Sequence, residues 1–320
     1  MSARLIVPLD HSNVAESALP LARGLANMLD GTVTLVGVVE APRAFAHSTG
    51  KRDPSIDVDH QPSRSDYIAP PSPFGRWGGW TNRQPSTKQV DELAQRTSKM
   101  ESYLKGTAQS FGDRHVEIVV KLGHPAEEII DIANHRDNSV IVMASHGRGG
   151  LGRALLGSVA TRVVQASSRP VFVVRGTDQA STGTGEVGLS RVLVPVDGSA
   201  FSEQALETVR KMFEGKQLKL HFVTAAHDPV FDETGKAPEY LKWLAEKVAD
   251  SFADVTWEVG DGPAGRVINQ VAESQNVDLI AMSTHGRSGF DRFVLGSVAE
   301  RVLHEATRPL LLLPARSAGA

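Results

Sequence analysis

Residues 142–174 read VMASHGRGGLGRALLGSVATRVVQASSRPVFVV, and residues 281–313 read AMSTHGRSGFDRFVLGSVAERVLHEATRPLLLL. The two stretches align without a gap, and a constant offset of 139 positions carries His146 onto His285. In each stretch an apolar run, a glycine-containing loop, a helical pattern and a second apolar run follow one another. A segment that recurs in this way predicts a repeated structural unit, which sets the organisation of the whole chain.

The beginning of the unit also occurs twice. RLIVPLD ends at Asp10, and RVLVPVD ends at Asp197, 187 positions later. The length of 320 residues is compatible with two domains. We therefore expect one domain over residues 1–176 and a second over residues 190–320. Residues 177–189 between them are rich in Gly, Ser and Thr and have no apolar period, which predicts a flexible linker.

The first copy contains an insertion that the second copy lacks. The two offsets differ by 48 positions, and the extra length falls mainly in residues 41–85. This segment is rich in Pro, Gly, Ser and charged residues, so it predicts a long loop without a core of its own. Its aromatic residues would either anchor a partner or pack on their own domain, and they are Tyr67, Phe74, Trp77 and Trp80.

Short apolar runs alternate with helical patterns in both copies. Strands are expected at Leu5–Leu9, Thr32–Val39, His115–Lys121, Ser139–Ala144 and Pro170–Val174, and again at Val192–Val196, Leu218–Thr224, Asp278–Ser283 and Pro309–Leu313. Helix starts are indicated by Ser12 and Ser199 as N-caps, by Ser86 and Gln89 as a capping box, and by Pro125. Apolar residues after Ser12 keep helical spacing as far as Leu25, which predicts one helix there. The last helices are expected at Ser158–Ser167 and Ser297–Ala306.

Strands separated by helices predict the α/β class, here two tandem doubly wound parallel five-stranded sheets flanked by helices. Such sheets bind ligands at the carboxyl ends of their strands, where the strand order reverses. The runs Pro170–Val174 and Pro309–Leu313 would be apolar edge strands, and an exposed apolar edge favours pairing. We therefore expect the two halves to pack there as a pseudo-twofold pair. Whether whole chains also form a homodimer stays open.

The loop after the fourth strand is the most informative part of each copy. It reads Ala144-Ser-His-Gly147, nine residues, then Gly157-Ser158 in the first copy, and Ser283-Thr-His-Gly286, nine residues, then Gly296-Ser297 in the second. Glycine lets backbone amides approach a phosphate, and the N-terminus of the following helix presents free N–H groups. The same loops contain the positive side chains Arg148, Arg153, Arg287 and Arg292. A polyphosphate is the expected ligand.

A simpler explanation of the same residues remains open. Gly157 and Gly296 would also permit a tight strand-to-helix connection without any ligand, and loop arginines are commonly just solvated. His146 and His285 would be candidate bases, but no carboxylate partner is visible nearby in the sequence. A hydrogen-bonding or structural role explains them as well, so no catalytic residue is assigned.

This loop pattern resembles that of the universal stress protein family, whose fold is related to that of the adenine nucleotide α-hydrolases. The resemblance covers both halves apart from the linker and residues 41–85. ATP-binding members of that family have Gly, two residues, Gly, nine residues, then Gly-Ser or Gly-Thr. Here Gly147 and Gly157, then Gly286 and Gly296, match the second and third glycines, while Ala144 and Ser283 replace the first.

The resemblance also implies roles for residues outside the loop. Asp10 and Asp197 would lie beside the ribose or the base, although each would also suit a helix N-terminus as a negative charge. Val38 and Val223 would hold adenine through their backbone, or else be ordinary core residues. The candidate nucleotide-binding residues are Pro8, Asp10, Val38, Ala144, His146, Gly147, Arg148, Gly157, Ser158 and Val159, with Pro195, Asp197, Val223, Ser283, His285, Gly286, Arg287, Gly296, Ser297 and Val298 in the second copy.

Composition and missing motifs exclude several other functions. The net charge of −3 argues against a general nucleic-acid binder, and there is no cysteine for a disulfide, a thiolate metal site or a cysteine nucleophile. The chain lacks a GxxxxGK[ST] P-loop and a GxGxxG motif after the first strand, and its histidines lack zinc-ligand spacing. It shows neither the apolar core of a signal peptide nor an apolar run long enough for a membrane span. We therefore expect a cytoplasmic protein without a metal site of its own.

The leading hypothesis is a stress-response protein that binds ATP, with Mg²⁺ or Mn²⁺ as an accompanying ion, and acts as a nucleotide-dependent regulator with little or no turnover. A slow ATPase or another adenine-nucleotide enzyme is the first alternative. A scaffold that acts through protein contacts without a nucleotide is the second. The sequence does not identify the stress signal or the protein partner.

Overall fold

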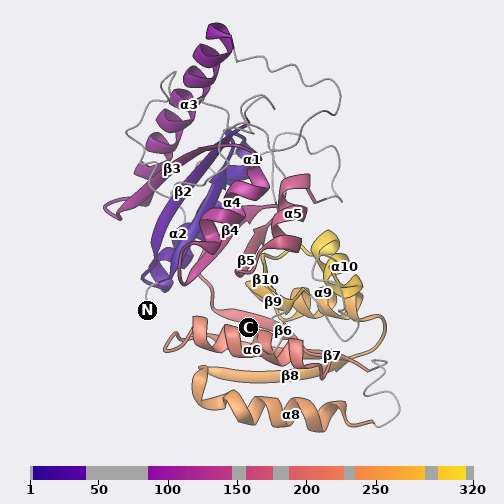
Figure 1. Cartoon of the computed structure of the whole chain (residues 1–320). Helices are drawn as coiled ribbons and strands as arrows, with labels where there is room; N and C mark the ends of the chain where they lie inside the picture. The colour runs from indigo at the N-terminus through magenta and orange to yellow at the C-terminus, as the bar shows by residue number, and fades with distance from the viewer. Residues whose placement is uncertain are drawn as a thin grey trace, which may run out of the picture.

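The computed structural model describes residues 3–40, 86–145, 156–175, 187–226, 235–284 and 295–314 (Figure 1). The first half contains β1 (Arg4–Leu9), α1 (Asn13–Glu16), α2 (Leu19–Met28), β2 (Thr32–Val39), α3 (Thr87–Ala108), η2 (Gln109–Phe111), β3 (Val116–Leu122), α4 (Pro125–Asn134), β4 (Ser139–Ala144), α5 (Ser158–Ala166) and β5 (Val171–Val174). The second half contains β6 (Arg191–Pro195), α6 (Ala200–Met212), β7 (Lys219–Ala225), α8 (Ala237–Val248), η3 (Ala249–Ser251), β8 (Asp254–Gly260), α9 (Ala264–Ser274), β9 (Leu279–Ser283), α10 (Ser297–Glu305) and β10 (Leu310–Leu313).

A ten-stranded sheet runs through the molecule in the order β3-β2-β1-β4-β5-β10-β9-β6-β7-β8. The strands of each half are parallel to one another. In the first half β1 lies between β2 and β4, and in the second half β6 lies between β7 and β9. The predicted α/β fold with parallel sheets is confirmed. The order reverses at β1 and at β6, which is where such sheets bind ligands.

The two halves are joined by the antiparallel pairing of β5 with β10. Phe172 pairs with Leu311, its equivalent in the repeat, while Val171 pairs with Leu312 and Val173 with Leu310. Because the equivalent residues Phe172 and Leu311 lie opposite each other, the two halves are related by an approximate twofold axis through this pair. The predicted pairing of the two apolar edge strands is therefore confirmed. Because the strands of the two halves run in opposite directions, their carboxyl ends lie at opposite ends of the sheet along the strand direction.

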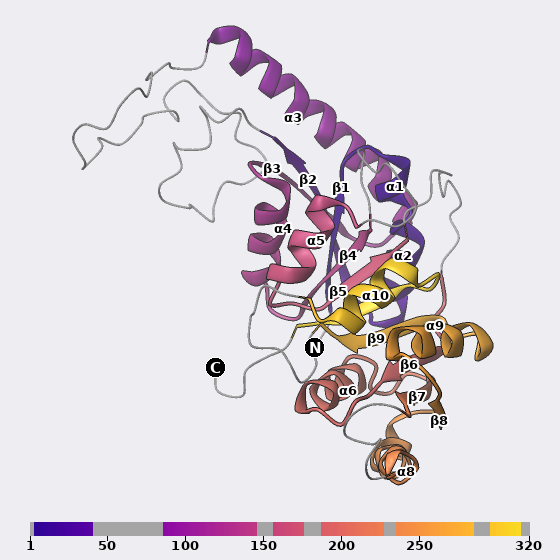
Figure 2. The same ribbon diagram turned by 90° about the vertical axis from the view of Figure 1, so that its right-hand side faces the viewer.

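Helices cover both faces of the sheet, as Figure 2 shows for α4 and α5 opposite α2. One buried core combines apolar side chains of α2, α3, α6 and α8 with one face of the strands. A second core combines α4, α5, α9 and α10 with the other face. Both cores contain residues of β5 and β10, so each continues from one half into the other. Over the residues that the structure describes, no helix has the length and apolar character that a membrane crossing requires.

The helix predicted after Ser12 is interrupted in the first half. Ser12 caps α1 as expected, but α1 ends at Glu16 and α2 begins only at Leu19, with Pro20 in its first turn. A proline inside a helix lacks an N–H donor and clashes with the carbonyl four residues earlier, here that of Glu16. The second copy has Glu207 at the equivalent position, and α6 runs from Ala200 to Met212 without a break.

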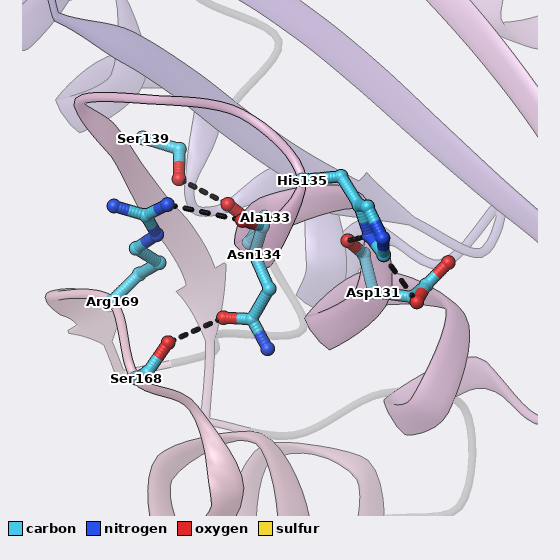
Figure 3. Close-up of polar contacts among 7 residues, drawn as sticks. All are labelled: Asp131, Ala133, Asn134, His135, Ser139, Ser168 and Arg169. Atoms are coloured by element: carbon cyan, nitrogen blue, oxygen red, sulfur yellow. Dashed lines mark hydrogen bonds and ion pairs between the residues drawn. The ribbon is translucent and has the colours of Figure 1, made fainter. Parts of the chain in front are cut away.

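Polar contacts fix α4 against the amino ends of β4 and β5 (Figure 3). Ser139 Oγ donates to the Ala133 carbonyl at 2.5 Å, and Arg169 Nη2 donates to the Asn134 carbonyl at 3.0 Å. Ser168 Oγ donates to Asn134 Oδ1 at 2.6 Å. The first two bonds satisfy backbone carbonyls that a helix C-terminus leaves without partners, and the third ties the Asn134 side chain to the segment before β5. They hold α4 at one end of β4, while the opposite end of β4 reaches the site described below.

The end of the predicted linker takes part in packing. Val187 N donates to the Pro20 carbonyl at 3.2 Å, and Leu189 is buried in the core. The absence of a side chain at Gly24 is required there, because a Cβ would lie 2.0 Å from the Val187 carbonyl oxygen. Residues 177–186 and the insertion at residues 41–85, with its aromatic residues, lie outside the described part of the chain.

The two halves differ in one buried polar position of the second strand. In the first half Thr34 lies opposite Glu117, whose carboxylate pairs with Arg136. Arg136 Nη1 also donates to Thr34 Oγ1 at 2.8 Å. Hydrogen bonds that Arg136 and Thr34 donate to the Glu117 carboxylate, together with the positive charge of Arg136, hold the pKa of Glu117 below its ordinary value. A charge that is partly buried here is thus paired and hydrogen-bonded.

His221 occupies the equivalent position in the second half and lies opposite Thr256. It is 4% exposed, and its Nδ1 lies 2.7 Å from Thr256 Oγ1. Its Nε2 lies 3.8 Å from Glu258 Oε2, and Gln275 Nε2 donates to the same carboxylate oxygen at 3.2 Å. Burial lowers the pKa of His221, Glu258 opposes this effect, and Arg191 adds to it.

We predict that His221 makes the second half less stable in mild acid. Its pKa is lowered by folding, so stability is complete above the unfolded pKa of about 6.5 and is lost as the pH falls through the folded pKa. His221→Thr, which installs the residue found at Thr34, should reduce this loss. Urea unfolding midpoints between pH 7.5 and pH 5 measure it.

The exposed His115 provides the control for this experiment. His115→Thr should keep the pH profile of the unmodified chain. If His221→Thr and the unmodified chain gave superimposable profiles, His221 would not be the titrating group.

Candidate functional site

A pocket of about 860 Å³ lies at the carboxyl ends of the strands in the first half. Its walls come from β1, β2 and β4, from the N-terminus of α5 and from residues of α3 and α4. This is the reversal point of the strand order, and the volume is typical of small-molecule sites. The pocket brings together seven residues predicted from the sequence, namely Pro8, Asp10, Val38, Ala144, Gly157, Ser158 and Val159.

Backbone hydrogen bonds fix both ends of the loop that follows β4. Ser145 N donates to the Val174 carbonyl at 2.7 Å, and Gly157 N donates to the Ser145 carbonyl at 2.7 Å. The second half repeats this arrangement, with Thr284 N on the Leu313 carbonyl at 2.9 Å and Gly296 N on the Thr284 carbonyl at 2.8 Å. The start of α5 or α10 is thereby held beside the end of the fourth strand of its half.

Gly157 and Gly296 are the N-cap residues of α5 and α10. Their dihedral angles are φ −62° and ψ 150°, and φ −61° and ψ 145°. Any residue adopts this extended conformation, so the backbone itself does not require glycine. Ser, Thr, Asp or Asn would cap these helices with a side-chain oxygen, whereas glycine provides none. The amide groups of the first turn are therefore not capped by the N-cap residue and suit an external anion.

Asp10 holds the turn between β1 and α1. Its Oδ1 accepts from Ser12 N at 3.1 Å and from Ser12 Oγ at 2.5 Å, and Ser12 Oγ in turn accepts from Ala15 N at 3.0 Å. Asp197 makes the same pair of contacts with Ser199, at 3.0 and 2.6 Å. The aspartate thus orients the serine that caps the next helix. In the first half Asp10 also lines the pocket.

His11 lies on the pocket wall in an unusual conformation. Its φ is 66°, and its ring stacks on Tyr103 of α3 with 4.1 Å between centroids. Tyr103 Oη donates to Glu16 Oε1 at 2.8 Å, and burial together with Glu16 raises the pKa of Tyr103. The equivalent of His11 in the second half is Gly198, with φ 73°. The two halves therefore keep the same left-handed turn with different side chains.

The second half places its predicted residues at equivalent points, with one exception. Pro195 ends β6, Asp197 follows it, Ser283 ends β9, and Gly296, Ser297 and Val298 begin α10. Val223 lies opposite Pro195, as Val36 lies opposite Pro8. Val223 is fully buried, and its carbonyl accepts from Val196 N at 2.9 Å. Ala225, not Val223, is therefore the counterpart of the pocket residue Val38.

The family is shown by comparison with known proteins. The sequence model of the universal stress protein family matches residues 1–175 and again residues 188–314. The chain belongs to the universal stress protein family. A universal stress protein of Mycobacterium tuberculosis is 29% identical over 280 residues, covering 83% of this chain and 90% of that one. Another from Synechocystis is 23% identical over 319 residues, covering 96% and 98%.

A solved structure shows the same fold over the whole length. The crystal structure of a universal stress protein from Archaeoglobus fulgidus superposes with a TM-score of 0.63 at 20% identity, covering 98% of each chain. The tandem arrangement of this universal stress protein therefore has a structural counterpart in that protein.

Some predicted residues of this universal stress protein lie outside the described part of the chain. They are His146, Gly147 and Arg148 in the first loop and His285, Gly286 and Arg287 in the second, together with Arg153 and Arg292. Among the described residues, no group of three His, Asp or Glu side chains is placed to hold a metal ion.

The pocket also contains residues that the loop motif did not predict. Arg96, Lys99 and Met100 of α3 line it, as do Pro125 and Ile129 of α4. The sequence carries no clear signal for Arg96 and Lys99, because both are exposed and lie off the buried stripe that Leu93, Met100 and Leu104 form on α3.

We predict that replacing Ser199, the N-cap of α6, and replacing Ser297, the first residue of α10, have different effects on stability. Ser199→Ala should lower the free energy of unfolding by about 1 kcal/mol, because it removes the N-cap of α6. Ser297→Ala should change it by less than about 0.5 kcal/mol, because Ser297 is exposed and is not a cap. Urea denaturation without nucleotide measures both. Equal losses would mean that Asp197 and Ser199 do not support the helix as described.

Proposed function

We propose that this universal stress protein binds ATP in both halves and acts in the cytoplasm as a nucleotide-dependent regulator with little or no turnover. The main support is the N-cap glycine of α5 and of α10. Glycine is not needed there for backbone conformation, and it is a poorer cap than serine or aspartate. Its presence in both halves is explained if a ligand approaches the amides of the first helical turn.

The described residues fit a phosphate group at this end of the pocket. The first amides of α5 and the Ser158 hydroxyl are donors, and the helix dipole favours a negative charge. In the second half Ser297 and Val298 begin α10 in the same way. Gly147, Arg148 and His146, with Gly286, Arg287 and His285, would complete the two phosphate loops by their place in the motif.

The nucleoside would occupy the part of the pocket beside β1 and β2. Pro8 and Val38 provide apolar wall there, and the Asp10 carboxylate is an acceptor for ribose hydroxyl groups. In the second half Pro195 and Asp197 take the same places, and Ala225 takes that of Val38. A bound nucleotide of this kind supplies a switch when one conformation of the protein binds it better than another.

Fast hydrolysis would require more than phosphate binding. Phosphoryl transfer needs a metal ion held at the phosphates and an oriented nucleophile, besides positive charge at the transition state. The described residues supply amides, hydroxyls and cations, but they contain no cluster of three candidate metal ligands. Mg²⁺ or Mn²⁺ would therefore arrive with the nucleotide, coordinated largely by phosphate oxygens and water. A regulator needs only the bound nucleotide, whereas an ATPase would also need an oriented nucleophile.

We predict that Gly157→Val and Gly296→Val remove the two nucleotide sites independently. A branched side chain at the N-cap would occupy the space that phosphate oxygens need, while the extended backbone tolerates valine. Titration calorimetry with Mg²⁺-ATP should give two sites in the unmodified chain, one in each single variant and none in the double variant.

Gly106→Val is the matched control, because Gly106 is exposed on α3 with open space around it. It should keep both sites. Retained ATP binding in a folded Gly157→Val/Gly296→Val variant would place the nucleotide elsewhere.

We also predict that ATP turnover is well below about 1 s⁻¹, the lower range of typical enzymes. The assay follows phosphate release with Mg²⁺ and separately with Mn²⁺. The double glycine variant, purified in parallel, measures contaminating ATPase. A rate at or above that value that disappears in the double variant would make the protein an ATPase.

A further inference from the structure

The pocket of the first half extends beyond the proposed nucleoside position onto α3. Glu40, at the end of β2, and Arg96, Lys99 and Met100 of α3 form this end of it. Helix α3 is held closely over β2, because a Cβ on Gly37 would lie 2.3 Å from Met100 Cγ. The packing of α3 therefore fixes the backbone that carries Arg96 and Lys99 to the rim of the pocket, where both side chains are exposed.

The basic residues of α3 fall into two kinds. Lys88 and Lys105 form ion pairs along the helix with Glu92 and Glu101. Arg96 and Lys99 line the pocket, and within the described part of the chain neither forms an ion pair with a carboxylate. Arg96 Nη1 donates to the Glu40 carbonyl at 3.0 Å, which leaves its other donors available.

The pocket thus has two ends that favour anions. One is the uncapped start of α5 beside β4, and the other is Arg96 with Lys99 over β2. Strand β1 and Asp10 lie between them. Neighbouring strands are about 4.8 Å apart, so β2 and β4 are separated by roughly 10 Å, a distance that a nucleotide spans. A nucleoside 5′-phosphate has anionic groups at only one end and would use only one of these sites.

We propose that the first-half pocket prefers nucleotides that carry a second phosphate on the ribose, bound by Arg96 and Lys99. This rests on the proposed function, because it assigns the 5′-phosphates to α5 and the nucleoside to the space beside β1. Guanidinium and ammonium groups form strong charge-assisted hydrogen bonds with phosphate. Glu40 lines the same end of the pocket, and its backbone carbonyl accepts from Arg96.

Matched ligands test the proposal. Adenosine 3′,5′-bisphosphate and adenosine 2′,5′-bisphosphate each differ from AMP by a single ribose phosphate. Calorimetry with the full chain carrying Gly296→Val reports on the first half, and ATP is titrated in parallel. One of the bisphosphates should bind at least about ten-fold tighter than AMP, the difference that one charge-assisted contact pair provides.

Two double variants then locate the effect. In Arg96→Gln/Lys99→Gln the affinity ratio of bisphosphate to AMP should fall to about one. Lys88→Gln/Lys105→Gln removes the same charge from the same helix away from the pocket, and it should keep the ratio. Equal loss of the ratio in both variants would indicate general attraction by the helix and would overturn the subsite.

The outcomes separate this inference from the proposed function. If ATP and AMP bind but neither bisphosphate binds more tightly than AMP, the ribose-phosphate subsite is wrong and nucleotide binding stands. If no adenine nucleotide binds to either half, the proposed function fails and the subsite fails with it.

Discussion

The antiparallel pairing of β5 with β10 is the interaction on which the rest of the structure depends. Each half alone would end in a four-residue apolar strand with an open edge, and such edges lead to aggregation. Pairing Phe172 with Leu311 satisfies both edges and continues the two cores across the junction. The same antiparallel pairing makes the strands of the two halves run in opposite directions. The two candidate sites, each at the carboxyl ends of its strands, therefore lie at opposite ends of the sheet and cannot share one ligand.

Within each half the candidate site is built mainly by backbone. Hydrogen bonds of Ser145 and Thr284 fix the loop ends, and the N-cap glycines present helix amides. Side chains then distinguish the halves, as Arg96 and Lys99 do at the first pocket. A site made of backbone amides survives divergence of the surrounding sequence, because amides are present whatever the side chain. This explains how one loop pattern persists in halves whose buried polar positions, such as Thr34 and His221, have changed.

The repeat and the alternation of apolar runs predicted nine strands to within about one residue, because burial on both faces of a parallel strand leaves a continuous apolar run. The bounds of β8 were not predicted, because this strand at the end of the sheet order is only partly buried and has no such run. The same uniformity hides register. Leu220 to Ala225 is buried throughout, so burial does not mark which residue reaches the pocket, and Val223 was assigned where Ala225 is the counterpart of Val38. Pro20 was visible in the sequence, but helical periodicity around it masked the break. Arg96 and Lys99 were not predicted because their role depends on how α3 docks through Gly37.

The turn after the first strand of each half shows that the surroundings of Asp10 and Asp197 are not equivalent. His11 and Gly198 adopt the same left-handed conformation, which costs little for glycine and of order 1 kcal/mol or more for a histidine. Stacking on Tyr103 offsets that cost in the first half and fixes the imidazole on the pocket wall. The second half has no side chain at this point. A molecule in the first-half pocket therefore meets a ring beside Asp10, whereas Gly198 places no side chain at the equivalent turn beside Asp197.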